Sequence, residues 1–384
     1  MNAAPRDDAI DMLRGLSILL VLLHHFNIAY PLRDTALAGL PGWPLLLALA
    51  RNGNYGVTIF FVISGFLITR NALERWGRLD AIRPAPFWRL RVARLLPTLA
   101  LTLAAVDALA LAGLPLFGNR AGSAVSLWTT NAAALGAWMN VLVIREGWIN
   151  YALGVMWSLS VEMAFYLLFP LACALLRREA RLALLAAALV IAGPLYRLAH
   201  QGDSEAYLYG YLACFDAIAI GCVAAALSRG RAWPASRRPG IRPLVGSAMA
   251  LLYLAWPISQ SNVLGASAMA LGAALLLPGQ PATGPAAPGL ARRALMRCGR
   301  DCYEIYLLHL LVLGLLRTWL PAAQASGDAR LGLLLAYFGG ACLLGALVSR
   351  HYSTPLNRRL RQWLGVAPAG PRQPAGDLSP RRPR

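Results

Sequence analysis

Arg14 and His25 are the residues whose types and spacing most strongly suggest chemistry. Both lie in an apolar segment, where an ionisable side chain is costly and is by default a functional candidate. At about 100° per residue, the step from Arg14 to His25 returns to within about 20° of the same helical face, ~16 Å further along. The pair predicts a cation near one membrane surface in line with an imidazole deep in the bilayer. His24 points about 100° away and is the alternative base.

The second candidate is Glu162, which ends the run WSLSVE at residues 157–162. Six residues into a span, it is expected ~9 Å below the outer end of a ~30 Å hydrocarbon core, which is close to the depth estimated for His25. A glutamate at that depth can orient the imidazole and raise its basicity. Trp157 and Ser158 are further candidates. The structural alternative is a glutamate satisfied by its neighbouring serines or by backbone.

A third group could bind phosphate. Arg91 and Arg94 are three residues apart, share a helical face, and can make bidentate contacts to phosphate. By spacing alone, a cluster of arginines at the cytoplasmic surface needs no ligand. Other candidates lie inside apolar segments, where packing is the competing explanation: Ser64, Asp107, Asp216, Tyr306 and His309.

The composition indicates what must hold these residues in place. The chain has 384 residues, of which 58% are hydrophobic and 14% are charged, whereas a soluble domain has about 25% charged residues. It is therefore predicted to be an all-α polytopic membrane protein. The net charge is +19, and all 36 basic residues are arginines. They cluster in short loops between apolar spans, which indicates cytoplasmic loops and not nucleic-acid binding.

Ten transmembrane helices are predicted, with both termini in the cytoplasm. An eleventh segment, Ser123 to Ile144, is unusually polar. If it does not cross the membrane, every arginine-rich loop falls on one side, including the one from Arg292 to Arg300. The region from Gly118 to Val155 is therefore expected to loop at the outer face. The ten predicted spans are 12–30, 55–71, 95–117, 156–176, 182–199, 207–227, 244–260, 263–277, 301–320 and 331–349.

The remaining sequence suggests one membrane domain and a tail. Residues 1–350 form the predicted domain, and 351–384 a basic, proline-rich, disordered cytoplasmic tail. Pro278 to Gly289 is expected to be a cytoplasmic linker. The first span lacks a cleavage site and is expected to remain as an anchor. The six cysteines lack the spacing of metal ligands, so they are expected to be free thiols and no metal is predicted.

Five segments in order resemble the acyltransferase-3 family of bacterial membrane acyltransferases, which includes O-antigen and exopolysaccharide O-acetylases. The chain is similar to stand-alone members without an esterase-like C-terminal domain. It departs from the family pattern in having Met-Ala where Glu-Gln is common after Glu162, and Cys302 where serine is usual. The matching segments are Arg14 with His25, Phe60 to Phe66, Arg91 with Arg94, Trp157 to Glu162, and Cys302 to His309.

The resemblance implies transfer of an acyl group, most often acetyl, from cytoplasmic acyl-CoA to a hydroxyl of a cell-envelope carbohydrate at the bacterial inner membrane. Arg14, Arg91 and Arg94 would bind the CoA phosphates. His25 would act as base, with Glu162 steadying the imidazolium; a transient acyl-histidine is the alternative chemistry. Acyl-CoA is then a substrate, and no bound cofactor is expected. The rival function is a transporter or flippase for a polar or lipid-linked sugar, although no inverted repeat is seen.

Overall fold

The computed structural model describes residues 7–39, 42–228, 240–277 and 289–366, and it confirms an all-α protein. Within these ranges the β-type pairing is limited to an isolated bridge between Asn119 and Asn150. The α-helices are α1 (Asp8–Ala29), α2 (Ala36–Gly39), α3 (Trp43–Arg51), α4 (Gly53–Trp76), α5 (Pro84–Leu111), α6 (Leu127–Leu135), α7 (Met139–Glu146), α8 (Met156–Leu176), α9 (Glu179–Ala199), α10 (Ser204–Tyr209), α11 (Tyr211–Ser228), α12 (Ile241–Ala255), α13 (Ile258–Leu276), α14 (Leu290–Arg300), α15 (Cys302–Trp319), α16 (Ala329–Val348) and α17 (Thr354–Trp363).

Eight helical segments of the described chain are long and apolar enough to cross a membrane, and they match eight of the ten predicted spans. The other two predicted spans fall on α12 and α13. α12 has 15 residues and so measures ~22 Å, less than the ~30 Å hydrocarbon core. α13 carries polar residues in its first turns, including Gln260 and Asn262. The eight segments are Asp8–Ala29, Trp43–Trp76, Pro84–Leu111, Met156–Leu176, Glu179–Ala199, Ser204–Ser228, Cys302–Trp319 and Ala329–Trp363.

The polar segment after α5 does not form a span. It folds as α6 and α7, which have nine and eight residues and are too short to cross a bilayer. Beyond α7 the chain runs inward, because residues 152–161 are all buried. The Asn150 side-chain oxygen accepts hydrogen bonds from the N–H groups of Ala152 and Leu153 and fixes this bend. Helix α8 therefore begins inside the protein, below its outer surface.

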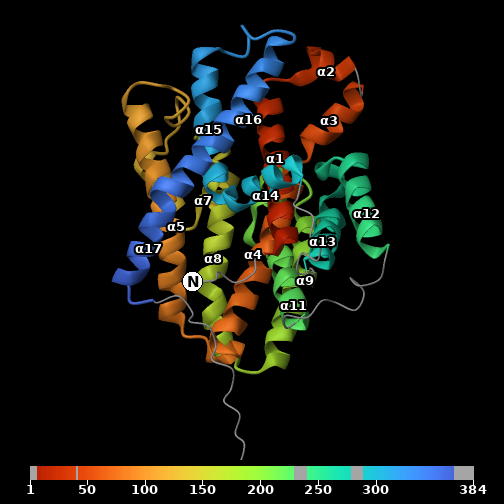
Figure 1. Ribbon diagram of the computed structural model, residues 1–384, viewed down its shortest axis with the longest axis vertical. Helices are drawn as coiled ribbons and strands as arrows, with labels where there is room; N and C mark the ends of the chain where they lie inside the picture. The colour runs from red at the N-terminus through yellow and green to blue at the C-terminus, as the bar shows by residue number, and fades with distance from the viewer. Residues whose placement is uncertain (1–6, 40–41, 229–239, 278–288, 367–384) are drawn as a thin grey trace, which may run out of the picture.

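Helix α4 lies at the centre of the bundle and packs against α1 and α11 (Figure 1). It approaches α11 so closely that a Cβ on Gly65 would come 2.1 Å from the carbonyl oxygen of Ile218. A Cβ on Gly221 would come equally close to the carbonyl of Val62. Glycine is therefore required at both positions, and the interpretation of Gly65 as a packing residue is confirmed.

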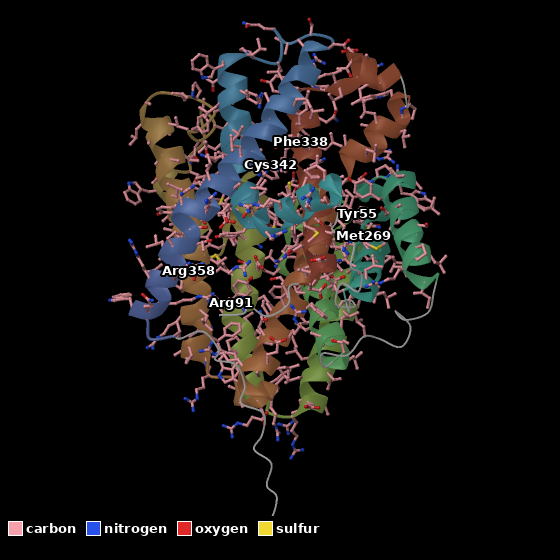
Figure 2. All side chains as sticks on the ribbon, viewed as in Figure 1. Tyr55, Arg91, Met269, Phe338, Cys342 and Arg358 are labelled. Carbon is pink, nitrogen blue, oxygen red and sulfur yellow. The ribbon has the colours of Figure 1, made fainter. Side chains whose placement is uncertain are left out.

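The two ends of the molecule differ in charge. The arginine-rich turns between α4 and α5 and between α8 and α9 lie at its lower end in Figure 1, whereas α15 and α16 are connected at the upper end. Nitrogen atoms at the tips of side chains are conspicuous at the lower end in Figure 2. For these two loops, this agrees with the prediction that the arginine-rich loops share one side.

One predicted cytoplasmic loop is a helix that contacts α1. Arg292 to Arg300 lies in α14, which packs across the first half of α1. The carbonyl oxygen of Leu295 faces Gly15, and that of Asp11 faces Gly299, so a Cβ at either glycine would clash. Residues 278–288 of the predicted linker lie outside the described residues.

The predicted boundary at residue 350 falls within continuous helix. α16 passes through a π-helical turn, Ser349–Ser353, into α17. The hydroxyl of Ser353 donates a hydrogen bond of 2.5 Å to Glu304 of α15, and α17 packs on α5. These contacts order the first part of the predicted tail, which is helical instead of disordered. Residues 367–384 lie outside the described residues.

Candidate functional site

A cavity of about 960 Å³ lies between α1, α4, α5, α14 and the segment from the π-helical turn into α17. Four acidic residues and seven arginines line it. The excess of arginine gives the cavity a positive potential that attracts anions. The arginines are Arg14, Arg70, Arg94, Arg297, Arg300, Arg350 and Arg358.

Ion pairs divide these arginines into two groups. Three have a carboxylate within 3.5 Å: Arg70 (Asp7), Arg297 (Asp301) and Arg300 (Asp11). The other four make no hydrogen bond and no ion pair with any residue that the structure describes: Arg14, Arg94, Arg350 and Arg358. Unpaired guanidinium groups around a cavity are suited to a phosphate-bearing ligand, because each can make bidentate contacts.

The structure separates the predicted phosphate ligands. Arg14 and Arg94 line the cavity, and Arg94 is solvent-accessible there although it lies ten residues into α5. Arg91 does not line it. Its guanidinium stacks 5.2 Å from the ring centres of Phe87 and Tyr166. Three helical residues leave the two side chains about 60° apart on one face of α5, where Arg91 lies against Phe87 and Tyr166 and Arg94 reaches the cavity.

Two arginines of the cavity were missed from the sequence. Arg350 lies in the π-helical turn and Arg358 in α17. Arg350 stood at the predicted domain boundary, and Arg358 in the predicted tail. Figure 2 shows Arg358 on the flank of the molecule, with Arg91 labelled below it. A π-helical turn inserts one residue into the hydrogen-bonding pattern, which changes the direction of the side chains after it, and such turns recur at functional sites. The π turn itself has no evident sequence signal.

The histidines lie together. The ring centre of His25 is 5.0 Å from that of His309 on α15 and 5.4 Å from that of His24. The Nδ1 of His25 lies 2.9 Å from the carbonyl oxygen of Val21, and that of His309 lies 2.6 Å from the carbonyl oxygen of Tyr306. A carbonyl only accepts, so these contacts place the hydrogen of the neutral ring on Nδ1 and leave Nε2 as the basic nitrogen.

His25 is better placed than His24 to act with a second group. His24 bonds through Nδ1 to the carbonyl of Ala50 at 2.8 Å, at the end of α3. His309 is fully buried, and its Nε2 has no hydrogen-bond partner among the described residues. A bare Nε2 beside His25 is the arrangement expected of a group that awaits a substrate. The geometry therefore favours the face that His25 shares with His309.

Tyr306 links this pair to α8. Its hydroxyl lies 2.7 Å from the Oγ of Ser158 and donates to the carbonyl of Val155 at 3.0 Å. Its ring centre is 5.6 Å from that of His309. Three of the additional candidates, Ser158, Tyr306 and His309, are thus contiguous in space.

Glu162 does not contact His25. Its Oε1 accepts hydrogen bonds from the hydroxyls of Ser64 and Tyr166. Cys302, at the start of α15, lies within electrostatic range of Glu162, Arg14 and Arg94. The glutamate is therefore placed near the arginine end of the site.

The predicted depth of Glu162 is accordingly wrong. Antiparallel packing sets Gly53 of α4 beside His24, and Gly56 beside the carbonyl of Ser17. Ser64 lies ~12 Å further along α4, level with the first turns of α1, and Glu162 lies with it. The estimate assumed that α8 starts at the outer membrane surface, whereas its first turn is already buried.

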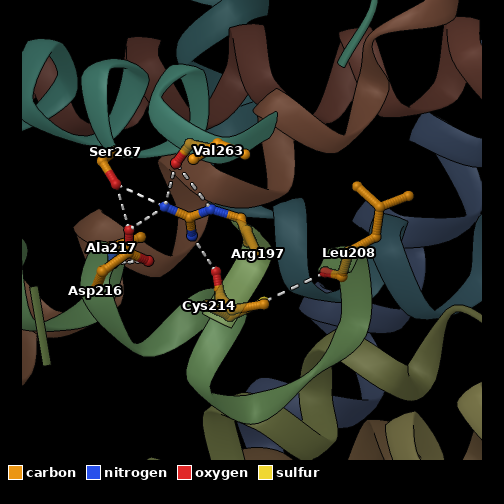
Figure 3. Close-up of polar contacts among 8 residues, drawn as sticks. Arg197, Leu208, Cys214, Asp216, Ala217, Val263 and Ser267 are labelled. Carbon is orange, nitrogen blue, oxygen red and sulfur yellow. Dashed lines mark hydrogen bonds and ion pairs between the residues drawn. The ribbon is translucent and has the colours of Figure 1, made fainter. Parts of the chain in front are cut away.

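Three predicted candidates lie in contacts away from the histidines. Asp107 accepts a hydrogen bond of 2.8 Å from Asn131. Asp216 pairs with Arg197 at 2.8 Å, and both side chains are almost fully buried (Figure 3). Trp157 packs 4.6 Å from the ring centre of Tyr209. None of these contacts involves His25 or the large cavity.

The cysteines are free thiols in the structure. The Sγ atoms of Cys298 on α14 and Cys342 on α16 lie 3.7 Å apart. Among the described residues, no group of three His, Cys, Asp or Glu side chains is arranged to hold a metal ion.

Comparison with known proteins gives a family over nearly the whole chain. The family model described as an acyltransferase domain, of the acyltransferase-3 type, matches residues 7–367. This range includes all the residues that line the large cavity, and both His25 and His309. No solved structure matches the protein.

Curated relatives match over part of the chain. The peptidoglycan O-acetyltransferase OatA of Listeria monocytogenes is 28% identical over 163 residues, which is 42% of this chain and 23% of that protein. The O-acetyltransferase OatA of Staphylococcus aureus is 28% identical over 168 residues, 42% of this chain and 24% of its own. A protein of Komagataeibacter xylinus described as a membrane-bound transacylase, BcsY, is 33% identical over 205 residues, covering 52% and 46%. The matches thus span less than half the length of each relative.

Proposed function

Because the chain belongs to the acyltransferase-3 family, we propose that it transfers an acyl group, acetyl in the first instance, from cytoplasmic acyl-CoA to a hydroxyl of a cell-envelope carbohydrate in the bacterial inner membrane. The carbohydrate class follows the printed names of the relatives, two of which are O-acetyltransferases, one of peptidoglycan. The observation that carries the proposal is the separation of two chemistries along one helix. Unpaired arginines gather at the start of α1, and histidines with a basic Nε2 lie near its end.

The donor would bind in the large cavity. The diphosphate and the ribose phosphate of acyl-CoA are multiply charged, and four unpaired guanidinium groups line the cavity walls. The other three arginines of the cavity are already paired with carboxylates of the protein. A ligand that supplies phosphates replaces water with charge-assisted hydrogen bonds.

Helix α1 sets the distance between binding and reaction. From Arg14 to His25 the helix rises ~16 Å, so a donor held by its phosphates must extend a flexible arm along α1 to react. The pantetheine arm of acyl-CoA has this form, with the thioester at its end. Glu162 lies at the arginine end with Ser64 and Tyr166, so its role in the proposal is to help hold that end in place.

His25 would act as general base. Its Nε2 removes the proton of the acceptor hydroxyl, whose oxygen attacks the thioester carbonyl and forms the new ester bond. The carbon–sulfur bond breaks, and the imidazolium returns its proton to the CoA thiolate. The hydrogen bond from Nδ1 to the Val21 carbonyl holds the ring in the required tautomer throughout. His309 lies beside it and supports its orientation.

The test is acyl transfer by His25→Ala with His24→Ala as its matched control. Purified protein is incubated with radiolabelled acetyl-CoA and cell-envelope glycan, and donor binding is measured separately by calorimetry. We expect His25→Ala to lose covalent labelling of the glycan by at least ~100-fold, the scale of general-base catalysis, while its affinity for acetyl-CoA is retained. His24→Ala should keep most of the activity, because His24 bonds to α3.

Two results would contradict the proposal. Full labelling by His25→Ala would remove the histidine from the chemistry. A wild-type protein that moves a sugar across vesicles without labelling it would favour the rival flippase.

A further inference from the structure

Two cysteine thiols face each other near the large cavity, and the proposed function does not use them. The Sγ of Cys298 on α14 lies 3.7 Å from the Sγ of Cys342 on α16. Figure 2 shows Cys342 near the point where α14 passes α16. Both side chains are partly exposed, whereas three of the other four cysteines are buried. A small oxidant can therefore reach this pair more easily than most of the other thiols.

The two sulfur atoms are close enough to be joined. In a disulfide they would lie about 2.05 Å apart, so the gap would have to close by about 1.7 Å. Because the cysteines lie on different helices, side-chain rotation and a small shift of one helix can share this movement. A bond at this position would add a covalent link between α14 and α16.

Cys298 has the properties of the attacking partner. A hydrogen bond from the Cys342 thiol lowers the pKa of Cys298 from 9.0 to about 7, against the opposing effects of burial and of Asp301. The guanidinium of Arg297 acts in the same direction as the hydrogen bond. The thiolate is the form that reacts with oxidants. An accessible thiolate next to a second thiol is the arrangement of redox-sensing cysteines.

The pair connects two walls of the large cavity. On α14, Arg297 and Arg300 stand on either side of Cys298 in the chain, and both line the cavity. On the other wall, the helix runs from Cys342 to Arg350, which lies eight residues and ~12 Å further along and also lines the cavity. A bond between the thiols would therefore set the distance between arginines on the two walls.

Helix α14 is held in place by α1. Its Gly299 packs so tightly that a Cβ there would come 1.8 Å from the carbonyl oxygen of Asp11. Gly15 of α1 packs in the same way against the carbonyl of Leu295. The shift that closes the gap must then be made by α16, which carries the π-helical turn and Arg350 with it. Oxidation is therefore expected to move Arg350 toward α14 and narrow the cavity.

We infer that Cys298 and Cys342 form a reversible disulfide that weakens donor binding, with hydrogen peroxide as the oxidant. The Cys298 thiolate attacks one peroxide oxygen, which breaks the oxygen–oxygen bond, releases hydroxide and leaves a sulfenic acid. The Cys342 sulfur then attacks the sulfur of Cys298, and its proton leaves with the hydroxyl group as water. Both sulfur atoms are oxidised, and the peroxide is reduced to water.

The inference rests on the proposed function, because the ligand whose binding changes is the acyl-CoA of that proposal. It adds regulation to the same site. Disulfides of intracellular proteins are usually transient and serve redox sensing, since cellular thiols reduce them. The arginine-rich segment that forms α14 is predicted to face the cytoplasm, so the bond should be reversible there.

The experiment oxidises purified protein in detergent with hydrogen peroxide and then reduces half of it with dithiothreitol. Peptide mapping without reductant locates the bond, and calorimetry measures the affinity for acetyl-CoA. Oxidised wild type should contain the Cys298–Cys342 bond and bind acetyl-CoA roughly tenfold more weakly, within the usual range of coupling between two sites. Dithiothreitol should remove the bond and restore the affinity.

Cys342→Ala and Cys222→Ala are the matched variants. Cys342→Ala leaves Cys298 without a partner, so peroxide should form no cross-link and leave the affinity for acetyl-CoA at its reduced value. Cys222 is also partly exposed, but it lies on α11 and does not line the large cavity. Cys222→Ala should therefore respond to peroxide as wild type does. The thermal midpoint of each reduced variant shows that it is folded.

The outcomes separate the two proposals. Absence of the Cys298–Cys342 bond after peroxide treatment overturns the inference. A bond that leaves the affinity for acetyl-CoA unchanged also overturns it, and so does an equal loss of affinity in oxidised Cys342→Ala. Reduced wild type that does not bind acetyl-CoA refutes the donor of the proposed function, whatever the peptide map shows.

Discussion

Arginines are buried or enclosed in two regions of this molecule, and the regions differ in whether the protein itself matches the charge. Arg197 is 1% exposed and bonds to Asp216, Ser267 and two carbonyls. In the large cavity, Arg14 and Arg94 make no hydrogen bond and no ion pair with a described residue, although Glu162 and Glu304 lie within electrostatic range of Arg94. Arg197, Arg14 and Arg94 each lie in a helix that is long and apolar enough to cross a membrane.

The difference assigns a role to each region. A charge that the protein satisfies joins helices, and its removal leaves an uncompensated partner. A charge that has no partner in the protein is available to an anionic ligand, which is the role we propose for the cavity arginines. Arginine content alone does not distinguish a binding site from a structural clamp. The pairing of each guanidinium does.

The largest effect is expected at the ion pair of Arg197 and Asp216. Arg197→Ala should destabilise the protein by about 3–5 kcal/mol, because it leaves Asp216 as a buried and unpaired charge. The thermal midpoint in detergent measures this loss. The double variant Arg197→Met with Asp216→Leu should recover most of it, since apolar side chains need no partner. A double variant as unstable as the single one would show that α9, α11 and α13 depend on the ion pair itself.

A smaller effect, on donor binding and not on stability, is expected at the arginines of the large cavity. Arg14→Ala and Arg350→Ala should each weaken acetyl-CoA binding about 10- to 100-fold, the loss of a charge-assisted hydrogen bond to phosphate. Their thermal midpoints should not fall, because no protein partner is abandoned. Calorimetry with acetyl-CoA measures the affinity. Added salt should reduce the difference between variant and wild type.

Arg70→Ala is the control within the same cavity. Arg70 already lies 3.5 Å from Asp7, so its removal should change donor affinity by less than about threefold. If Arg70→Ala weakens binding as much as Arg14→Ala, pairing does not predict which arginines bind the donor, and the comparison fails.

The sequence predicted the parts of this site that depend on one helix. The face shared by Arg14 and His25 follows from helical periodicity, and α1 holds both residues as expected. Eight of the spans could also be predicted, because hydropathy and the arginine content of loops depend on local composition. The identity of His25 as the proposed base also needed only the position of one residue in one helix.

The parts that depend on packing between helices were not predictable. The depth of Glu162 was wrong because residues 152–161 are buried by a bend at Asn150, which hydropathy does not reveal. Arg350 and Arg358 were assigned to a tail, since the π-helical turn that directs them inward has no sequence signal.

The smallest effect is expected at Arg91. Arg91 was grouped with Arg94 by spacing, yet it stacks on Phe87 and Tyr166 instead of lining the cavity. Arg91→Leu should therefore lower stability by only about 0.5–1 kcal/mol, the scale of a cation–π contact. Its affinity for acetyl-CoA should stay within about twofold of wild type.

Arg94→Leu is the matched substitution three residues away. It should lose donor affinity about 10- to 100-fold, whereas Arg91→Leu should not. The two variants each remove one of two neighbouring charges from the same face of α5, so the contrast tests which guanidinium reaches the donor. Equal losses of donor affinity in both would mean that Arg91 leaves its aromatic stack to bind phosphate. A guanidinium that stacks on aromatic rings would then also have to be counted among the groups that can bind the donor.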